Sequence, residues 1–512
     1  MKTLDQLTEK LNISTDRRQV KELVFDSRKI CEGCLYIAIK GAKFDGHSAI
    51  AQAAEKKAAA VLAQYADDEQ KKACEEAGCA LHIVEDTRLA LALCSAAWFD
   101  HPADKLCTIG ITGTKGKSTT AFMVKSAAEE LGLKTGLIGT VEIDTGARHI
   151  PSVNTTPESY DLQSYLKEMS DNGCKLVVME VSSQGLMMHR TAGIDFNVGV
   201  FTNFSPDHIG PGEHKDLEDY LHCKSLLFKS CRTSVVNADD EKTPDILKDN
   251  TCDKIIRYGF SENADVRAVS FEPSHETGQL SSDLKFTADG REYKMMLPFP
   301  GRFSAYNILS ALTAVCAARE SYEDMDKIEA GLSKSLVKGR MELLPVSEDY
   351  SLMIDYAHNA MALESLLKAL RGHCKGRLIT LFGCGGNRAK SRRYEMGEVS
   401  GRLSDLTVIT SDNPRDEEPL DIIADIEEGM SRTDGAHVTI ADRREAIAYA
   451  MHEAAAGDLV ILAGKGHEDY QEIRGVKHHM DERELVYSIL KEDGNKAAMA
   501  RMCERYPYLA DK

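Results

Sequence analysis

The chain has 512 residues, which is long for one hydrophobic core, and at about 100 to 200 residues per domain it predicts roughly three domains. A formal net charge of −18 argues against binding to a nucleic-acid backbone, which needs a positive surface. No apolar run has signal-peptide or membrane-spanning length, and 14 scattered cysteines predict free thiols in a reducing cytoplasm.

Residues 1–102 are predicted to form a small α/β domain. A short strand lies between glycines at 33–41, an alanine-rich helix is expected at 50–63, and another strand at 80–84. Ser27 stands in a polar stretch before the first of these strands, and its spacing alone predicts only a polar turn. A polar segment that contains proline then marks the end of the domain.

A glycine-rich stretch at 110–120 separates a buried strand at 106–111 from a helix at 121–131. Glycines let backbone N–H groups surround a phosphate, Lys117 can reach the β and γ oxygens, and the Ser118 hydroxyl can ligate Mg²⁺. The spacing is that of the G-T-x-G-K-[ST] variant of the P-loop. It predicts a nucleoside-triphosphate site, and the alternative is an ordinary glycine-rich turn.

Residues 103–336 alternate predicted strands and helices, the pattern of a mostly parallel sheet. Glu180 stands near a strand end, where a carboxylate can hold Mg²⁺, although a lone acid there is often only a helix-cap partner. His208 follows the next strand, where ordinary hydrogen bonds satisfy most histidines. Lys224 lies on an amphipathic helix, where its stem can pack while its ammonium reaches solvent.

Residues 337–512 have a parallel-sheet rhythm of their own and predict a Rossmann-like domain. Four buried strands are expected, at 352–358, 377–383, 406–410 and 458–464. Each ends in a polar loop, and the carboxyl ends of parallel strands meet at one edge, so the loops predict a binding face. Asp412-Asn-Pro in the third loop also has the form of a helix start with proline first.

Taken in order, these motifs resemble those of the Mur ligase family over almost the whole chain, and most closely the branch that adds the third residue of the peptidoglycan stem peptide. The stretches that carry the resemblance are 25–28, 113–118, 154–157, 180–183, 207–208, Lys224, Asn307, 339–342, 355–358, 383–386, 412–415 and 464–468.

The resemblance implies an ATP- and Mg²⁺-dependent amide ligase of cytoplasmic peptidoglycan precursor synthesis. It would add meso-diaminopimelate to the D-glutamate of UDP-N-acetylmuramoyl-L-alanyl-D-glutamate through an acyl phosphate, with no covalent enzyme intermediate. Residues 1–102 would bind the UDP-muramoyl substrate, 103–336 ATP, and 337–512 the amino acid. The protein is expected to act as a monomer, without membrane or nucleic acid.

The resemblance also implies a role for particular residues. The catalytic residues are expected to be Lys117, Glu180, His208 and Lys224. Mg²⁺ would be held by Ser118, Glu180, His208 and a carbamylated Lys224. ATP would be held by Gly113, Thr114, Gly116, Lys117, Ser118, Thr119, Asn307, Arg340, Asp355 and His358. The UDP-muramoyl peptide would be held by Ser27, Thr155, Thr156, Ser183 and Arg190. The amino acid would be held by Arg388, Asp412, Asn413, Arg415, Gly464 and Glu468.

Alternatives follow from the places where the chain departs from the family pattern, at Gln184, Met188, Asn359 and Asn387. The same ligase could add L-lysine or another diamine amino acid, because only a distal carboxylate would need Arg415. More remote alternatives are a folylpolyglutamate-synthase-like ligase and a P-loop nucleotide switch that ligates nothing.

Overall fold

The computed structural model describes residues 2–41, 44–207, 209–210, 213–274 and 280–512. The chain folds into two compact units. The first comprises Met1–Arg267, Ala288–Gly290 and Tyr306–Leu332, and the second comprises Ala268–Thr287, Arg291–Ala305 and Ser333–Lys512. Among the described residues, no helix combines the length and the apolar character needed to cross a membrane.

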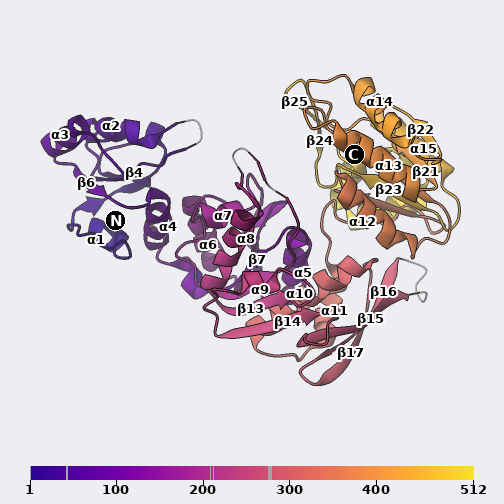
Figure 1. The fold of residues 1–512 in the computed structure, drawn as a ribbon, viewed down its shortest axis with the longest axis horizontal. Helices are drawn as coiled ribbons and strands as arrows, with labels where there is room; N and C mark the ends of the chain where they lie inside the picture. The colour runs from indigo at the N-terminus through magenta and orange to yellow at the C-terminus, as the bar shows by residue number, and fades with distance from the viewer. Residues whose placement is uncertain (1, 42–43, 208, 211–212, 275–279) are drawn as a thin grey trace. The chain divides into compact units, whose positions relative to one another are not determined.

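The N-terminal part of the first unit is a four-stranded parallel sheet in the order β3-β4-β5-β6 (Figure 1). Its strands are β3 (Glu22–Val24), β4 (Cys34–Ile37), β5 (Ala60–Ala63) and β6 (Ala80–Ile83), and a small pair joins β1 (Lys2–Thr3) to β2 (Gln19–Val20). Its helices are α1 (Leu4–Leu7), α2 (Ile50–Glu55), α3 (Asp68–Ala77) and α4 (Thr87–Trp98).

The helix predicted at 50–63 was wrong beyond Glu55, because residues 60–63 form strand β5. This Ala-Val-Leu-Ala run is buried along its whole length between β4 and β6. A short apolar run inside a parallel sheet has no polar alternation to distinguish it from a buried helix. The alanines therefore misled the sequence analysis at this point.

The larger sheet of the first unit has the order β10-β9-β8-β11-β7-β12-β13-β14. The strands from β8 to β14 in this order are parallel, and β9 and β10 form an antiparallel edge, which confirms the predicted mostly parallel sheet. Their bounds are β7 (Cys107–Thr112), β8 (Thr135–Ile138), β9 (Glu142–Asp144), β10 (His149–Pro151), β11 (Leu176–Glu180), β12 (Phe196–Phe201), β13 (Cys231–Asn237) and β14 (Lys254–Gly259).

Helices cover this sheet because its strands are apolar on both faces. Val177 and Met179 of β11, for example, pack in one cluster with Leu162 and Leu166 of α6. The helices of this part are α5 (Lys117–Glu130), α6 (Ser159–Asp171), α7 (Ser183–Met187), α8 (Leu217–Ser225), α9 (Thr243–Ile246), α10 (Arg302–Arg319) and α11 (Met325–Lys334).

The second unit contains a six-stranded sheet in the order β18-β19-β23-β20-β21-β22, parallel except for its edge strand β18. The strands are β18 (Glu342–Leu344), β19 (Ser351–Asp355), β20 (Leu378–Phe382), β21 (Leu406–Ile409), β22 (His437–Thr439) and β23 (Leu459–Ala463). Three further strands lie side by side in the order β15 (Val266–Ser274), β16 (Ser281–Ala288) and β17 (Arg291–Leu297). A separate hairpin joins β24 (Tyr470–Ile473) to β25 (Val476–His479).

Alternate residues of β23 belong to two different hydrophobic clusters, each shared with helices of this unit. Val460 and Leu462 pack with Ile447 of α15, whereas Ile461 packs with Leu367 of α12. The helices are α12 (Ala360–Arg371), α13 (Ser391–Leu403), α14 (Pro419–Met430), α15 (Arg443–Glu453), α16 (Glu482–Glu492) and α17 (Lys496–Arg505). In an open α/β sheet of this kind, ligands bind at the loops that follow the carboxyl ends of the strands.

Candidate active site

The glycine-rich loop lies between Thr112, the last residue of β7, and Lys117, the first residue of α5. Gly113 and Gly116 have φ values of +145° and +86°, which other residues rarely adopt. A Cβ atom at Gly113 would lie 1.9 Å from the Thr202 hydroxyl, and one at Gly116 would lie 2.5 Å from Asn307 Oδ1. Both positions therefore require glycine.

Two lysines converge on this loop. Lys117 Nζ donates to the Gly113 and Thr114 carbonyl oxygens at 2.9 and 3.1 Å, and Lys224 Nζ from α8 donates to the same Gly113 oxygen at 2.9 Å. Lys224 is 1% exposed, so the predicted alternative of a solvent-reaching ammonium is wrong. Burial, and then the neighbouring Lys117, hold the pKa of Lys224 well below its usual value.

Glu180 ends β11 and is buried beside the loop. The Ser118 hydroxyl donates to Glu180 Oε2 at 2.9 Å, and the Thr140 backbone N–H donates to Oε1 at 2.7 Å. The two residues expected to hold Mg²⁺ thus offer adjacent oxygen atoms, the ligand type that this cation prefers. His208, the third expected ligand, lies outside the described residues.

Three of the residues expected to hold the muramoyl peptide gather around the end of β11. The Thr155 hydroxyl lies 3.0 Å from that of Thr140, which itself donates to Glu180 at 3.2 Å. The Thr156 hydroxyl donates to the Glu180 carbonyl oxygen at 3.0 Å, and Arg190 donates to the Thr156 carbonyl oxygen at 2.9 Å.

The two remaining residues of this group have different surroundings. Ser183 begins α7, and its hydroxyl lies 2.8 Å from His214 Nε2. Ser27 lies in the N-terminal part of the unit, where it begins a short 3₁₀ turn capped by Asp26, as its spacing predicted. No hydrogen bond among the described residues joins Ser27 to the other members of the group.

In the second unit, a compact group forms at the end of β19. Asp355 accepts backbone N–H bonds from Met341 and Ala357, both at 2.8 Å, and burial raises its pKa. The Arg340 guanidinium lies 4.7 Å from the centre of the Tyr356 ring. His358 Nδ1 donates to the Tyr356 carbonyl oxygen at 2.8 Å, and burial lowers its pKa. The structure thus brings Arg340, Asp355 and His358 together.

The loops after β21 and β23 meet around a lysine that the sequence analysis did not name. Lys465 is fully buried, and its Nζ donates to Asn413 Oδ1 and to Glu468 Oε2, both at 2.9 Å. Asn413 in turn donates to Glu468 at 2.8 Å. Asp412 Oδ1 is buried without a hydrogen-bond partner, 3.6 Å from Lys465 Nζ. The signal was present, since Lys465 stands between the predicted Gly464 and Glu468.

Arg415 is held by backbone and side-chain contacts rather than by a helix start. Its Nη1 donates to the Gly386 carbonyl oxygen at 2.7 Å, and its Nε lies 3.1 Å from Glu472 Oε2 of the β24–β25 hairpin. The helix start predicted at Asp412-Asn-Pro was wrong, because α14 begins at Pro419. Arg388 is exposed, and its side chain makes no hydrogen bond or ion pair within the described residues.

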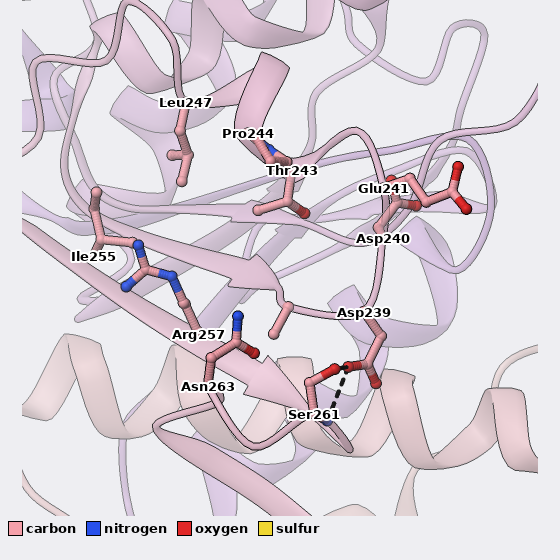
Figure 2. Close-up of a pocket in the computed structure, with 11 residues that line it drawn as sticks. Asp239, Asp240, Glu241, Thr243, Pro244, Leu247, Ile255, Arg257, Ser261 and Asn263 are labelled. Atoms are coloured by element: carbon pink, nitrogen blue, oxygen red, sulfur yellow. Dashed lines mark hydrogen bonds between the residues drawn. The ribbon is translucent and has the colours of Figure 1, made fainter.

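A cavity of ≈ 630 Å³ lies at the carboxyl ends of β13 and β14, and the sequence analysis did not predict it (Figure 2). Two of its acidic side chains accept hydrogen bonds from backbone N–H groups. Asp239 accepts from the Phe260 and Ser261 backbone N–H groups at 2.7 and 2.9 Å, and Asp240 accepts from Phe204 N–H at 2.8 Å. These bonds tie the loops at this edge of the sheet to one another.

The fold and the loop together define an α/β protein built around a phosphate-type glycine loop. Family descriptions match three parts of the chain: "Mur ligase family, catalytic domain" at residues 19–98, "Mur ligase middle domain" at 111–315, and "Mur ligase, glutamate ligase domain" at 339–466.

Individual relatives match almost the whole length. UDP-N-acetylmuramoyl-L-alanyl-D-glutamate--2,6-diaminopimelate ligase of Clostridium perfringens (strain 13 / Type A) is 40% identical over 482 residues, covering 93% of this chain and 96% of the relative. The enzyme of that name from Clostridioides difficile (strain 630) is 38% identical, covering 96% and 98%. A solved structure of a ligase of that name has a TM-score of 0.71 at 28% identity, covering 96% and 99%. The chain therefore belongs to the Mur ligase family.

Proposed function

We propose that this protein is an ATP-dependent amide ligase that joins meso-diaminopimelate to the D-glutamate of UDP-N-acetylmuramoyl-L-alanyl-D-glutamate in cytoplasmic peptidoglycan precursor synthesis. The names of its relatives support this substrate pair. The observation that carries the proposal is Glu180, which accepts from Ser118 of the phosphate loop and, through Thr140, contacts Thr155 of the expected peptide group. Phosphate donor and carboxylate acceptor would meet at this residue.

The division of labour proposed for the chain follows its three family matches. Residues 1–102 would bind the UDP-muramoyl part, with Ser27 as a contact, residues 103–336 would bind ATP, and residues 337–512 would bind the amino acid. The monomeric state and the absence of membrane or nucleic-acid partners stay predictions. The predicted ATP contacts within the first unit are Gly113, Thr114, Gly116, Lys117, Ser118, Thr119 and Asn307. Those within the second unit are Arg340, Asp355 and His358.

Mg²⁺ would be held by Ser118 and Glu180, together with His208 and a carbamylated Lys224, and it would neutralise charge on the phosphates. The buried surroundings of Lys224 suit this modification. Because its pKa is lowered, more of the side chain is the neutral amine that can react with CO₂. The resulting carbamate would turn a cation into an anionic oxygen ligand.

The reaction would proceed in two displacements. The D-glutamate carboxylate of the muramoyl peptide, which Thr155, Thr156, Ser183 and Arg190 would bind, attacks the γ-phosphorus, and ADP leaves with the electrons of the broken bond. The diaminopimelate amine then attacks the acyl phosphate carbon and phosphate leaves. Because like charges meet in the first step, the main work of Lys117 is to neutralise and position. No side chain needs to form a covalent bond to substrate.

Selection of diaminopimelate is proposed for the loops of the second unit. Among the described residues, the two hydrogen bonds of the Arg415 side chain use only two of its five N–H donors, so its guanidinium can also pair with a distal carboxylate. The Glu468 carboxylate suits an ammonium group, and Asp412, Asn413, Gly464 and Arg388 would complete the pocket. Although burial would raise the pKa of Glu468, the Lys465 ammonium lowers it, so the group stays ionised.

Phosphate release tests the proposal. Purified protein would receive ATP, Mg²⁺ and UDP-N-acetylmuramoyl-L-alanyl-D-glutamate, with either meso-diaminopimelate or L-lysine as the amine. We expect release that needs the muramoyl dipeptide and strongly prefers diaminopimelate, with the preference lost in Arg415→Ala. Equal turnover with lysine would overturn the proposed preference for diaminopimelate. Phosphate release at the same rate without the dipeptide would overturn the proposed ligase activity.

A further inference from the structure

Three side chains form a row between α7 and α8. His214 precedes α8 and is fully buried. Its Nε2 lies 2.8 Å from Ser183 Oγ, and its Nδ1 lies 3.0 Å from Asp219 Oδ2 in the first turn of α8. Both ring nitrogens therefore have a hydrogen-bonding partner, and the serine, histidine and carboxylate are linked in series.

The carboxylate fixes where the hydrogens of this row lie. An ionised carboxylate only accepts hydrogen bonds, so the imidazole tautomer that matches Asp219 carries its hydrogen on Nδ1 and donates it to that carboxylate. Nε2 then accepts, and the Ser183 hydroxyl donates to it. The oxygen lone pairs of Ser183 remain for a ligand, so Ser183 is presented as a hydrogen-bond acceptor.

A metal site is a poorer explanation of the same residues. Cys223 Sγ lies within 4.8 Å of ligand atoms of His214 and Asp219. A metal ion would have to take a ring nitrogen that already has a partner. Burial raises the pKa of the Cys223 thiol to about 11, which disfavours the thiolate that binds metals. The row is therefore a hydrogen-bonded relay and not a ligand set.

The row is anchored to the phosphate loop through α8. The Tyr220 ring lies 5.0 Å from that of His214, and its hydroxyl donates to Thr114 Oγ1 at 3.3 Å. Lys224 Nζ lies 4.2 Å from the centre of the same tyrosine ring. Helix α8 thus contacts both the phosphate loop and His214. These contacts fix the position of Ser183 relative to the phosphate loop.

We propose that His214, held by Asp219, is a positioning residue that fixes Ser183 Oγ as an acceptor for a peptide N–H of the muramoyl dipeptide. This inference rests on the proposed function, which supplies a ligand with amide N–H donors next to the carboxylate that reacts. His214 and Asp219 act through Ser183 and would not touch the ligand themselves.

Calorimetric binding of UDP-N-acetylmuramoyl-L-alanyl-D-glutamate tests the inference. We expect Ser183→Ala and His214→Ala each to weaken binding about tenfold, the size of one lost hydrogen bond. The double variant should also lose about tenfold, because His214 acts through Ser183. His214→Gln should stay within about threefold of wild type, since the glutamine oxygen can accept from Ser183. The KM values for ATP and diaminopimelate should change less than twofold.

His222→Ala is the matched control, because His222 is an exposed histidine of the same helix, and it should bind like wild type. If His214→Ala has a lowered melting temperature, Asp219→Ala is measured in its place. That change removes the partner of His214 Nδ1 and keeps the buried ring, and we expect it to weaken dipeptide binding about threefold. Unchanged binding in a folded His214→Ala or Asp219→Ala, or about a hundredfold loss in the double variant, would overturn the relay. Wild-type protein that does not bind the dipeptide would overturn the proposed function and this inference with it.

Discussion

The two candidate regions handle positive charge in opposite ways. At the phosphate loop of the first unit, the Nζ atoms of Lys117 and Lys224 donate to one carbonyl oxygen, and Lys117 helps to depress the pKa of Lys224. In the second unit, Lys465 donates to Glu468 and Arg415 pairs with Glu472. The first arrangement gains from an added anion such as a polyphosphate. The second is locally balanced and suits a zwitterion such as an amino acid.

The largest effect is expected when the first region loses a cation. Lys117→Met should lower kcat about a thousandfold, because a preorganised charge on the transferring phosphate is lost. Single-turnover phosphate release would measure it, with thermal melting as the check on folding. A loss smaller than about tenfold in a well-folded variant would mean that Lys117 does not face the transferring phosphate.

Removal of the buried cation from the second region should cost stability first. Lys465→Met leaves Glu468 and Asp412 without their positive neighbour, and breaking a buried pair costs about 3 kcal/mol or more. Denaturant unfolding of the two variants Lys465→Met and Lys465→Met/Glu468→Gln would measure it. The second variant should recover part of the loss, and an equal loss in both would show that Lys465 is not balanced by Glu468.

Acid should destabilise the second region by protonating His467. Burial, and then Arg340, lower the pKa of His467 from 6.5 to about 4, and its Nδ1 is buried without a partner. Between these values the unfolded chain binds more protons than the folded chain, so the free energy of unfolding falls by about 2.5 kcal/mol as the pH drops from 6.5 to 4. Melting curves at pH 7 and 4.5 should show a smaller drop for His467→Asn than for wild type. Equal drops would contradict the assignment.

The smallest effect is expected from the partly exposed partner of Arg415. Glu472→Gln should raise KM for diaminopimelate only about two- to fivefold, since a partly exposed ion pair is worth about 1 kcal/mol or less. KM for ATP should not change. A rise above about fiftyfold would indicate that Glu472 itself contacts the amino acid.

The two regions also differ in how far their residues could be predicted from the sequence. The phosphate loop was found because Gly113 and Gly116 are demanded by local backbone geometry, and Ser118 and Glu180 stand at fixed places on a helix and a strand. Lys465 and His214 were missed because their importance comes from partners distant in sequence, such as Asn413 and Ser183.

Two local misreadings have similar causes. The run 60–63 was assigned to a helix because burial between two strands cannot be read from four apolar residues. The Asp412-Asn-Pro stretch predicts a helix start, but Arg415 pairs with Glu472 of the β24–β25 hairpin and α14 begins only at Pro419. Tertiary packing decided both cases.

Transfer of an oxygen isotope tests the central claim most directly, that the substrate carboxylate attacks the phosphate at the Glu180 edge. The D-glutamate side-chain carboxylate of the dipeptide would carry ¹⁸O, and the phosphate released with ATP and diaminopimelate would be examined by mass spectrometry. We predict one ¹⁸O atom per phosphate released, because the carboxylate oxygen that attacks leaves with the phosphate. Released phosphate without the label would contradict an acyl phosphate and the ligase chemistry built on it.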